Sequence, residues 1–224
     1  MLKLFYKKLC NHFGPRGWWP TLERGYSEDN KTRILTDAER FEISIGAILT
    51  QSTSWKNVEK ALKNLKQKNL LDKDKLREID INRLAEIIKP SGYNNQKTKK
   101  IKEFIKFLDS KKEINRENLL KVWGIGKETA DSILLYAYRQ PIFVIDTYTR
   151  RIMNRIGFKE NNYDELQELF MKNLPKDDKI YNEFHALLVE LGKNICKKEP
   201  LCEKCPLNKE CDYFKNKSLA ESDK

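Results

Sequence analysis

The sequence predicts an all-α fold, and three observations support this prediction. Apolar residues recur every three or four positions in several segments, as they do in helices that bury one face. No segment alternates apolar and polar residues cleanly over four or more positions, which is the pattern of a half-buried strand. The chain has 224 residues, of which 39% are hydrophobic, so it has enough apolar material to bury a core.

The helical spacing appears in three groups: Phe41, Ile45, Ile48 and Leu49; Val58, Leu62 and Leu65; and Ile101, Phe104, Ile105 and Leu108. Asp37 and Asp72 are expected to cap helices at their N-termini, and Pro90-Ser-Gly92 is expected to separate two helices. The β-branched stretch at 142–145 is too short for a confident strand pattern. It is expected to be a buried connector that leads into a helix.

The charge of the chain favours a polyanionic partner. Lys and Arg number 44 against 33 Asp and Glu, which gives a net charge of +11. Neutralising phosphates releases counterions and so drives binding to nucleic acid. An excess of charged residues is also typical of the surfaces of thermophilic proteins, so the charge alone does not establish a nucleic-acid partner. No apolar run approaches the roughly 20 residues of a membrane span, and residues 1–8 lack a signal-peptide core. A cytoplasmic protein without a membrane contact is expected.

Four cysteines lie close together near the C-terminus, with the spacing Cys196-x5-Cys202-x2-Cys205-x5-Cys211. Thiolates bind soft metals, and four in one short loop can close around one Zn²⁺ or a [4Fe–4S] cluster. Zinc ribbons normally use two Cys-x2-Cys pairs, whereas only Cys202 and Cys205 have that spacing here. The sequence therefore predicts a [4Fe–4S] cluster, with Zn²⁺ as the alternative.

A glycine-rich turn, Gly124-Ile-Gly126, separates two helical segments and is followed by Lys127. Two glycines there permit positive φ and a close backbone approach. Backbone N–H groups at the start of the second helix can then bind a phosphate. Gly124, Gly126 and Lys127 are therefore candidate DNA-binding residues.

Asp146 follows the apolar run 142–145 and precedes a helical segment. An aspartate at this place is typical of a helix N-cap. The apolar run would also keep the carboxylate out of open solvent, where a catalytic group can be tuned. Both interpretations stay open on the sequence alone.

Together these segments resemble the helix-hairpin-helix DNA glycosylases of the endonuclease III superfamily. The resemblance spans roughly residues 35 to 212. It includes Ala47-Ile-Leu-Thr-Gln-Ser-Thr53, Pro90-Ser-Gly-Tyr-Asn-Asn-Gln-Lys97, the glycine turn, Asp146 and the cysteine loop.

The resemblance implies two helical lobes with DNA crossing the cleft between them. One lobe is expected at 35–142, with a helix-hairpin-helix motif at about 116–138. The other is expected to combine 1–34 with 143–224 and to carry the cluster loop 196–211. A monomer that acts on double-stranded DNA with a damaged base is implied.

By the same resemblance, Asp146 matches the catalytic aspartate that supports cleavage of the N-glycosidic bond of a flipped nucleotide. Gln51, or its neighbour Ser52, corresponds to the side chain that fills the gap left by the extruded base. The histidines, His12 and His185, are assigned no role.

Two departures from the family pattern matter. Bifunctional members have a lysine two residues after the second hairpin glycine, where it forms a Schiff base and nicks the strand. That position is Glu128 here, and Lys127 lies about 100° away around the helix, so it is expected to face the DNA backbone. The first cysteine gap is five residues, where the family usually has six.

Within the superfamily, the sequence looks most like the 3-methyladenine glycosylase branch. Trp18, Trp19 and Trp55 contribute to this impression and are candidates for the base pocket. Aromatic faces suit alkylated purines, which carry positive charge. The expected function is a monofunctional DNA glycosylase on alkylated purines such as 3-methyladenine. Two alternatives stay open: a bifunctional glycosylase and abasic-site lyase on oxidised pyrimidines, with Lys127 as nucleophile, and a non-catalytic iron–sulfur DNA-binding protein.

Overall fold

The computed structural model describes residues 1–216. The regular elements of this part of the chain are helices joined by turns and loops. Apart from one isolated bridge between Thr21 and Gly25, these residues contain no β-pairing. The predicted all-α class is therefore confirmed. No helix in this part of the chain is both long enough and apolar enough to cross a bilayer.

The chain divides into two compact units. Unit 1 contains Met1–Trp18, Ser27–Lys31 and the described residues from Pro141 onward, and unit 2 contains Trp19–Tyr26 and Thr32–Gln140. Each unit combines segments that are distant in the sequence. Unit 1 has three such segments and unit 2 has two.

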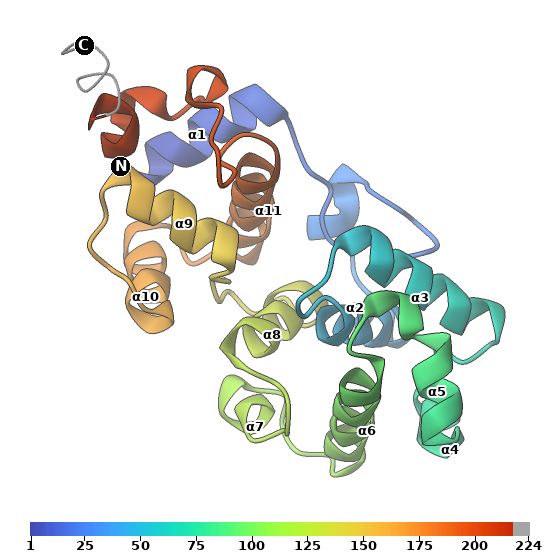
Figure 1. Ribbon diagram of the computed structural model, residues 1–224. Coiled ribbons are helices and arrows are strands. Elements are labelled where there is room, and N and C mark those ends of the chain that lie inside the picture. Colours follow the sequence, from blue (N-terminus) through green and yellow to red (C-terminus); the bar gives the residue numbers. More distant parts are fainter. Residues whose placement is uncertain (217–224) are drawn as a thin grey trace. The chain divides into compact units, whose positions relative to one another are not determined.

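Unit 1 is built around its longest helix, α11 (Asp178–Asn194), and both α1 and α9 pack against this helix (Figure 1). Its elements are α1 (Leu2–Phe13), η1 (Glu28–Lys31), α9 (Thr147–Ile156), α10 (Tyr163–Asn173), α11 (Asp178–Asn194), η4 (Cys202–Lys204) and η5 (Asn208–Glu210). Its core contains stacked rings, since Phe143 and Phe170 lie 4.0 Å apart between centroids. The cysteine loop follows α11 directly.

Unit 2 contains the remaining helices, and α2 contacts several of them. Its elements are α2 (Asp37–Leu49), α3 (Trp55–Gln67), α4 (Lys73–Glu78), α5 (Ile81–Ile87), η2 (Lys89–Ser91), α6 (Asn94–Asp109), α7 (Arg116–Leu120), α8 (Lys127–Ser132) and the π-helix η3 (Ile133–Ala137). Pro90 lies in η2, so this segment does separate two helices as the sequence predicted. The π-helical continuation of α8 has no signal in the apolar spacing.

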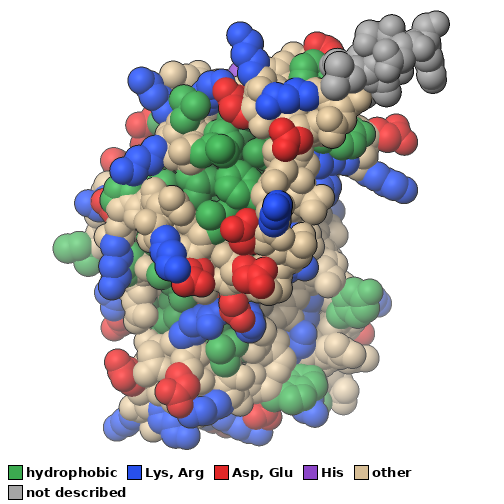
Figure 2. Space-filling model, turned by 90° about the vertical axis from the view of Figure 1, so that its left-hand side faces the viewer, with side chains coloured by type: hydrophobic (Ala, Val, Ile, Leu, Met, Phe, Trp, Pro, Cys, Tyr) green, Lys and Arg blue, Asp and Glu red, His purple; other side chains and the backbone are tan. Residues whose placement is uncertain are grey.

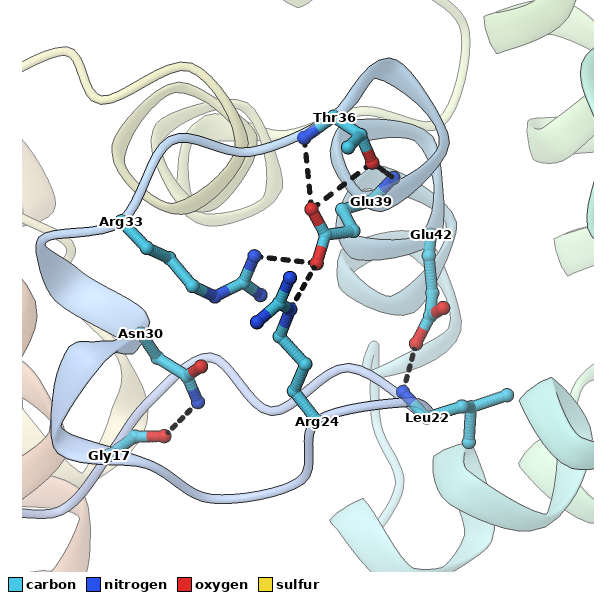
Figure 3. Close-up of polar contacts among 8 residues, drawn as sticks. All are labelled: Gly17, Leu22, Arg24, Asn30, Arg33, Thr36, Glu39 and Glu42. Carbon is cyan, nitrogen blue, oxygen red and sulfur yellow. Dashed lines mark hydrogen bonds and ion pairs between the residues drawn. The ribbon is translucent and has the colours of Figure 1, made fainter.

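The start of α2 corrects one predicted cap. Thr36, rather than Asp37, is the N-cap, and it forms a capping box with Glu39. Figure 3 shows the Glu39 carboxylate between this cap and two arginines, with Arg33 Nη1 at 2.5 Å and Arg24 Nε at 3.1 Å. Burial raises the pKa of Glu39, but the hydrogen bonds from Thr36 and Arg33 outweigh burial and leave the pKa below its usual value. The predicted cap at Asp72 is present, since its side chain accepts from Lys75 N–H.

The segment Trp19–Tyr26 belongs to unit 2, whereas the expected lobe had grouped all of 1–34 with the C-terminal half. Polar contacts to α2 explain this difference. Leu22 N–H donates to Glu42 at 2.6 Å, and Arg24 pairs with Glu39. Trp19 adds an apolar contact, because a Cβ on Gly46 would lie 3.1 Å from its ring. Such tertiary contacts are not visible in the spacing of the segment itself.

Candidate functional site

Asp146 lies at the N-terminus of α9 in unit 1. Its Oδ1 accepts the backbone N–H of Thr149 at 2.7 Å, so Asp146 is the N-cap of the helix. Its side chain is largely buried, with the residue 8% exposed. Because Oδ1 is engaged by the helix, Oδ2 is the oxygen that remains for other chemistry.

The apolar run before Asp146 is buried, as the sequence predicted, and α10 fixes its backbone. Phe143, Val144 and Ile145 are at most 1% exposed. The Gln167 side-chain amide donates to Phe143 O at 2.7 Å, and Ile145 N–H donates to the Tyr163 hydroxyl at 3.4 Å. The position of the carboxylate is thus determined by α10 as well as by α9.

His185 of α11 lies beside this carboxylate. Its Nε2 is 3.8 Å from Asp146 Oδ2, and the residue is 7% exposed. Burial lowers the pKa of His185, and the charge of Asp146 only partly opposes this shift. This neighbour has no signal in the sequence, because Asp146 and His185 are far apart in the chain and are positioned by different helices.

The predicted hairpin is present in unit 2, between α7 and α8. Gly124 has φ +83°, and a Cβ there would lie 2.4 Å from Lys100 Cγ. Gly126 has φ −90° and ψ 179°, and a Cβ there would meet nothing within 4 Å. Only the first glycine therefore needs its conformational freedom, which corrects the expectation for both.

Lys127 and Glu128 occupy the first two positions of α8, and both are exposed. Trp123, in the same turn, is 48% exposed, and Lys99 Nζ lies 4.3 Å from its ring centroid. The sequence analysis missed Trp123, because an aromatic residue in a turn does not reveal on its own whether it points outward. Cationic and aromatic groups therefore lie together at this turn.

Gln51, at the turn between α2 and α3, is joined to the hairpin. Its Nε2 donates to Gly124 O at 3.0 Å and to Thr129 Oγ1 at 2.8 Å, while its Oε1 accepts from Lys100 Nζ at 2.5 Å. Ser52 follows with φ 52° and is exposed. The amide predicted to enter the DNA gap is thus hydrogen-bonded within unit 2.

Lys97 is a buried lysine close to this turn. It is 1% exposed, and its Nζ donates to Leu49 O at 2.8 Å and to Ser91 O at 2.6 Å. Burial, with a smaller effect from the Lys100 charge, lowers the pKa of Lys97 to about 8. The side chain joins the C-terminus of α2 to η2.

Two of the three candidate aromatic residues form a contacting pair within one unit. Trp19 and Trp55 lie in unit 2 with ring centroids 5.1 Å apart, edge to face, and Tyr136 is 5.2 Å from Trp19. Trp19 is 5% exposed, while Trp55 is half-buried. Trp18 belongs to unit 1. The structure therefore brings two of the three predicted pocket residues together.

Arginines from α9 organise the cysteine loop of unit 1. Arg155 Nη1 donates to Cys196 Sγ at 3.2 Å and to Lys197 O at 2.5 Å, and its Nη2 donates to Lys198 O at 2.9 Å. Arg151 donates to Cys196 O and to Gly192 O. Asp146 and the first cysteine of the loop are thereby connected through one helix.

All four cysteines, Cys196, Cys202, Cys205 and Cys211, line one pocket. None of them is in a disulfide. Burial raises the pKa of Cys205 to about 11 and also raises the pKa of Cys211. Within residues 1–216, no three or more His, Cys, Asp or Glu side chains are arranged to hold a single metal ion.

Positive and negative side chains are interspersed on the surface. Figure 2 shows Lys and Arg side chains spread over the face drawn, with Asp and Glu between them. Several lysines form pairs within one helix, such as Lys121 with Glu117 and Lys172 with Glu168. Exposed pairs of this kind contribute little to stability.

Comparison with known proteins gives consistent similarities. Residues 45–176 match the family described as HhH-GPD superfamily base excision DNA repair protein. A Methanocaldococcus jannaschii protein provisionally named a DNA repair glycosylase is 42% identical over 94% of this chain and 96% of its own length. Endonuclease III of Thermotoga maritima is 32% identical over 83% of this chain and 88% of its own length.

Two solved structures extend the comparison. The H. pylori 3-methyladenine DNA glycosylase MagIII, bound to 1,N6-ethenoadenine, has a TM-score of 0.67 and 31% identity, covering 86% of this chain and 95% of that one. A non-covalent endonuclease III–DNA complex has a TM-score of 0.80 and 21% identity, covering 97% of each chain, and shows the shared fold. With the family match and the identity to relatives over most of their length, the chain belongs to the HhH-GPD superfamily of base excision DNA repair proteins, as a DNA repair glycosylase of the endonuclease III superfamily.

Proposed function

We propose that this glycosylase removes alkylated purines such as 3-methyladenine from double-stranded DNA by hydrolysis, and that it leaves the abasic strand intact. The observation that carries the proposal is the Asp146 carboxylate, buried and fixed at its cap while Oδ2 remains available. Glu128 stands where bifunctional members have their lysine nucleophile. The 31% identity to the H. pylori 3-methyladenine glycosylase supports this branch.

Asp146 is the proposed catalytic residue. As the bond between base and sugar breaks, positive charge develops on the sugar, and a nearby carboxylate stabilises it. The carboxylate can also take a proton from the attacking water, whose oxygen bonds to the sugar carbon. The departing base keeps the bonding electrons, which cancel its positive charge, so it leaves as a neutral free base. The proton taken from water passes from the carboxylate to solvent. Water is the only co-reactant, and the products are the free base and an abasic site.

The hairpin is the proposed phosphate contact. At Gly126 the space where a Cβ would lie is open, so a phosphate can approach the backbone N–H groups at the start of α8. Lys127 is exposed at the first position of that helix and adds a positive charge. Because phosphate contacts release counterions, this binding should weaken as salt rises.

Gln51 is the proposed side chain that fills the gap left by the flipped base. To do so, its amide must leave Gly124 O, Thr129 Oγ1 and Lys100 Nζ. Two of these partners belong to the hairpin itself. Binding of DNA to the hairpin and release of Gln51 would therefore be linked.

The proposed base pocket uses Trp55 and Trp19, with Trp18 as a further candidate. An alkylated purine carries positive charge, so an aromatic face attracts it by stacking and by cation–π attraction. Trp55 is the more accessible member of the edge-to-face pair. Trp19, whose ring contacts the Trp55 ring edge to face, would hold the Trp55 ring in its orientation.

We further propose that Cys196, Cys202, Cys205 and Cys211 hold a [4Fe–4S] cluster. The four thiols line one pocket, and their spacing lacks the two Cys-x2-Cys pairs of a zinc ribbon. The donor set fits a cluster, and the Arg155 guanidinium near Cys196 Sγ would balance thiolate charge. Bound there, the cluster would supply a covalent cross-link for the loop. A zinc site remains the alternative outcome of a metal analysis.

The lyase alternative has one observation in its favour, which is that Lys127 lies one residue before the position of the usual nucleophile. Base release and strand nicking distinguish the two activities. The experiment incubates the protein with methylated duplex DNA, measures the released base by chromatography, and examines the strand on a denaturing gel with and without borohydride. Free 3-methyladenine with an intact strand is expected. Borohydride trapping on an oxidised-pyrimidine duplex would favour the lyase, and binding without base release from either would favour a non-catalytic protein.

A further inference from the structure

His185 and Asp146 form a buried pair in unit 1. Their facing atoms, Nε2 and Oδ2, are 3.8 Å apart, and both residues are less than a tenth exposed. This separation is longer than a direct hydrogen bond. A small side-chain movement, or one bridging water, would join the two groups.

The imidazole ring is held in place by its surroundings. His185 lies within the 17-residue helix α11, and its ring packs edge to face on Phe143, with centroids 6.4 Å apart. Phe143 also belongs to the run that leads into Asp146. The segment that leads to the carboxylate is thus in contact with the imidazole ring.

The ionisation of the pair follows from burial. Burial disfavours the charged imidazolium and lowers the pKa of His185, so the ring is neutral at neutral pH. Asp146 is the charge that opposes this shift. Two further carboxylates of α11 have cationic partners of their own: Glu183 pairs with Lys31, and Glu190 pairs with Arg16. Arg151 of α9 is directed to backbone carbonyls at the far end of α11.

We propose that His185 is a positioning residue for Asp146, whose Nε2–H orients the Oδ2 oxygen toward the sugar of the flipped nucleotide. Thr149 N–H fixes Oδ1, and His185 fixes Oδ2, so both oxygens of the carboxylate have defined directions. Each carboxylate oxygen has two acceptor sites, so Oδ2 can accept from His185 and still face the reacting sugar. The inference rests on the proposed function of Asp146 and adds a residue to which the sequence assigned no role.

Protonation of His185 gives the proposal a pH signature. Once the ring is an imidazolium, it binds the carboxylate as an ion and reduces the negative charge available to the sugar. Base release should therefore fall on the acid side, as His185 takes up its proton. The part of this decline that disappears when the imidazole is replaced by a side chain that does not titrate is the signature of His185.

The activity test compares two variants with the wild-type chain in single-turnover base release across pH. His185→Phe keeps an aromatic ring but removes the nitrogen, and His185→Gln keeps a side-chain N–H donor that does not titrate. We expect His185→Phe to reduce the rate by up to about 100-fold, the loss associated with a misplaced catalytic group, while DNA binding stays unchanged. His185→Gln should recover most of the rate at neutral pH and show a weaker acid-side decline. A wild-type rate in folded His185→Phe would overturn the inference.

A second test does not depend on activity. The chain has two histidines, His12 and His185, so their imidazole signals in NMR can be assigned with a His12→Gln variant, and exposed His12 serves as the internal reference. We expect the His185 pKa to fall further in Asp146→Asn, because the charge that raises it is gone. An unchanged His185 pKa would overturn the pairing. If the wild-type chain released no base from any duplex, the proposed function would fail, and this titration would still decide whether the pair exists.

Discussion

Asp146 combines two roles in one side chain. As the N-cap of α9 it accepts the Thr149 N–H through Oδ1, and as a buried carboxylate it presents Oδ2 beside His185. The hydrogen bond from the Thr149 N–H gives the carboxylate a fixed direction. An asparagine can form the same cap, because it too offers a side-chain oxygen acceptor. Chemistry and folding at this residue can therefore be separated by a single substitution.

Asp146→Asn should remove base release while leaving the fold and DNA binding in place. The reason is that asparagine keeps the cap but carries no charge to stabilise the sugar or to accept a proton. A loss of about 100-fold to 10,000-fold in single-turnover rate is expected. The measurement is base release at saturating enzyme, with DNA affinity from fluorescence anisotropy as the control. Turnover close to the wild-type rate would remove Asp146 from its catalytic role.

The two hairpin glycines should respond differently to alanine. Gly126→Ala meets open space and an extended backbone, so the free energy of unfolding should change by no more than about 1 kcal/mol, while DNA affinity falls about tenfold as the methyl group blocks a phosphate. Gly124→Ala is the matched control. Its φ of +83° and the Lys100 contact should lower the free energy of unfolding by about 1–3 kcal/mol. Unchanged DNA affinity in Gly126→Ala would argue against the phosphate site.

At the residue scale, the sequence predicted local features well and distant neighbours poorly. The cap and the apolar run around Asp146 are contiguous, so their pattern is readable. His185 next to Asp146 and Lys100 next to Gln51 depend on how separate helices pack, and neither pair has a spacing signal. The burial of Trp19 has the same origin.

At the element scale, Lys97 connects the end of α2 with η2. The buried ammonium group of Lys97 donates hydrogen bonds to the backbone carbonyls of Leu49 and Ser91. The turn that carries Gln51 begins directly after α2. The stability of this junction therefore determines the starting position of the side chain proposed to enter DNA.

Lys97→Met should lower the free energy of unfolding at pH 7 by about 1–3 kcal/mol, because two buried carbonyls lose a charged donor. The deficit should grow with pH. The pKa of Lys97 is about 8 in the folded chain against a usual 10.5, so between these values the unfolded chain binds more protons and the wild-type stability rises with pH. This contribution of Lys97 to the free energy of unfolding is absent below about pH 8 and complete above pH 10.5. Denaturant unfolding from pH 7 to 10.5 measures it, and parallel pH profiles for the two proteins would contradict the assignment.

Helix positions were largely predictable from the spacing of apolar residues, because burial of one face dictates that spacing. The N-cap of α2 was predicted one residue too late, at Asp37, whereas the capping box begins at Thr36. The change from α8 to the π-helix η3 was not predictable, because both have a similar apolar pattern over so few residues.

At the scale of the whole molecule, each unit is assembled from segments separated in sequence. Trp19–Tyr26 illustrates the limit of prediction, since its membership in unit 2 depends on Glu39, Glu42 and Gly46 of α2. In unit 1, Asp146 caps the N-terminus of α9 (Thr147–Ile156), and Arg155 near the other end of this helix contacts the cysteine loop. Loss of the loop should accordingly affect the stability of the whole unit.

Cys205→Ala should lose iron and lower the thermal stability of the protein, because one of four ligands is removed. The matched control is Cys10→Ala, which changes a half-buried cysteine of α1 outside the loop. Metal analysis of wild-type protein purified without oxygen should give four irons per chain for a [4Fe–4S] cluster. One zinc and no iron in the wild-type protein would replace the cluster by the zinc alternative.

The most direct test of the central claim is a single-turnover comparison of base release from two duplexes, one carrying 3-methyladenine and the other an oxidised pyrimidine, with wild-type chain and Asp146→Asn. We predict release of 3-methyladenine by the wild-type chain alone, with the strand intact and no borohydride adduct. Preferential release of the oxidised pyrimidine together with a trapped Lys127 adduct would contradict the account, and would make the protein a bifunctional glycosylase.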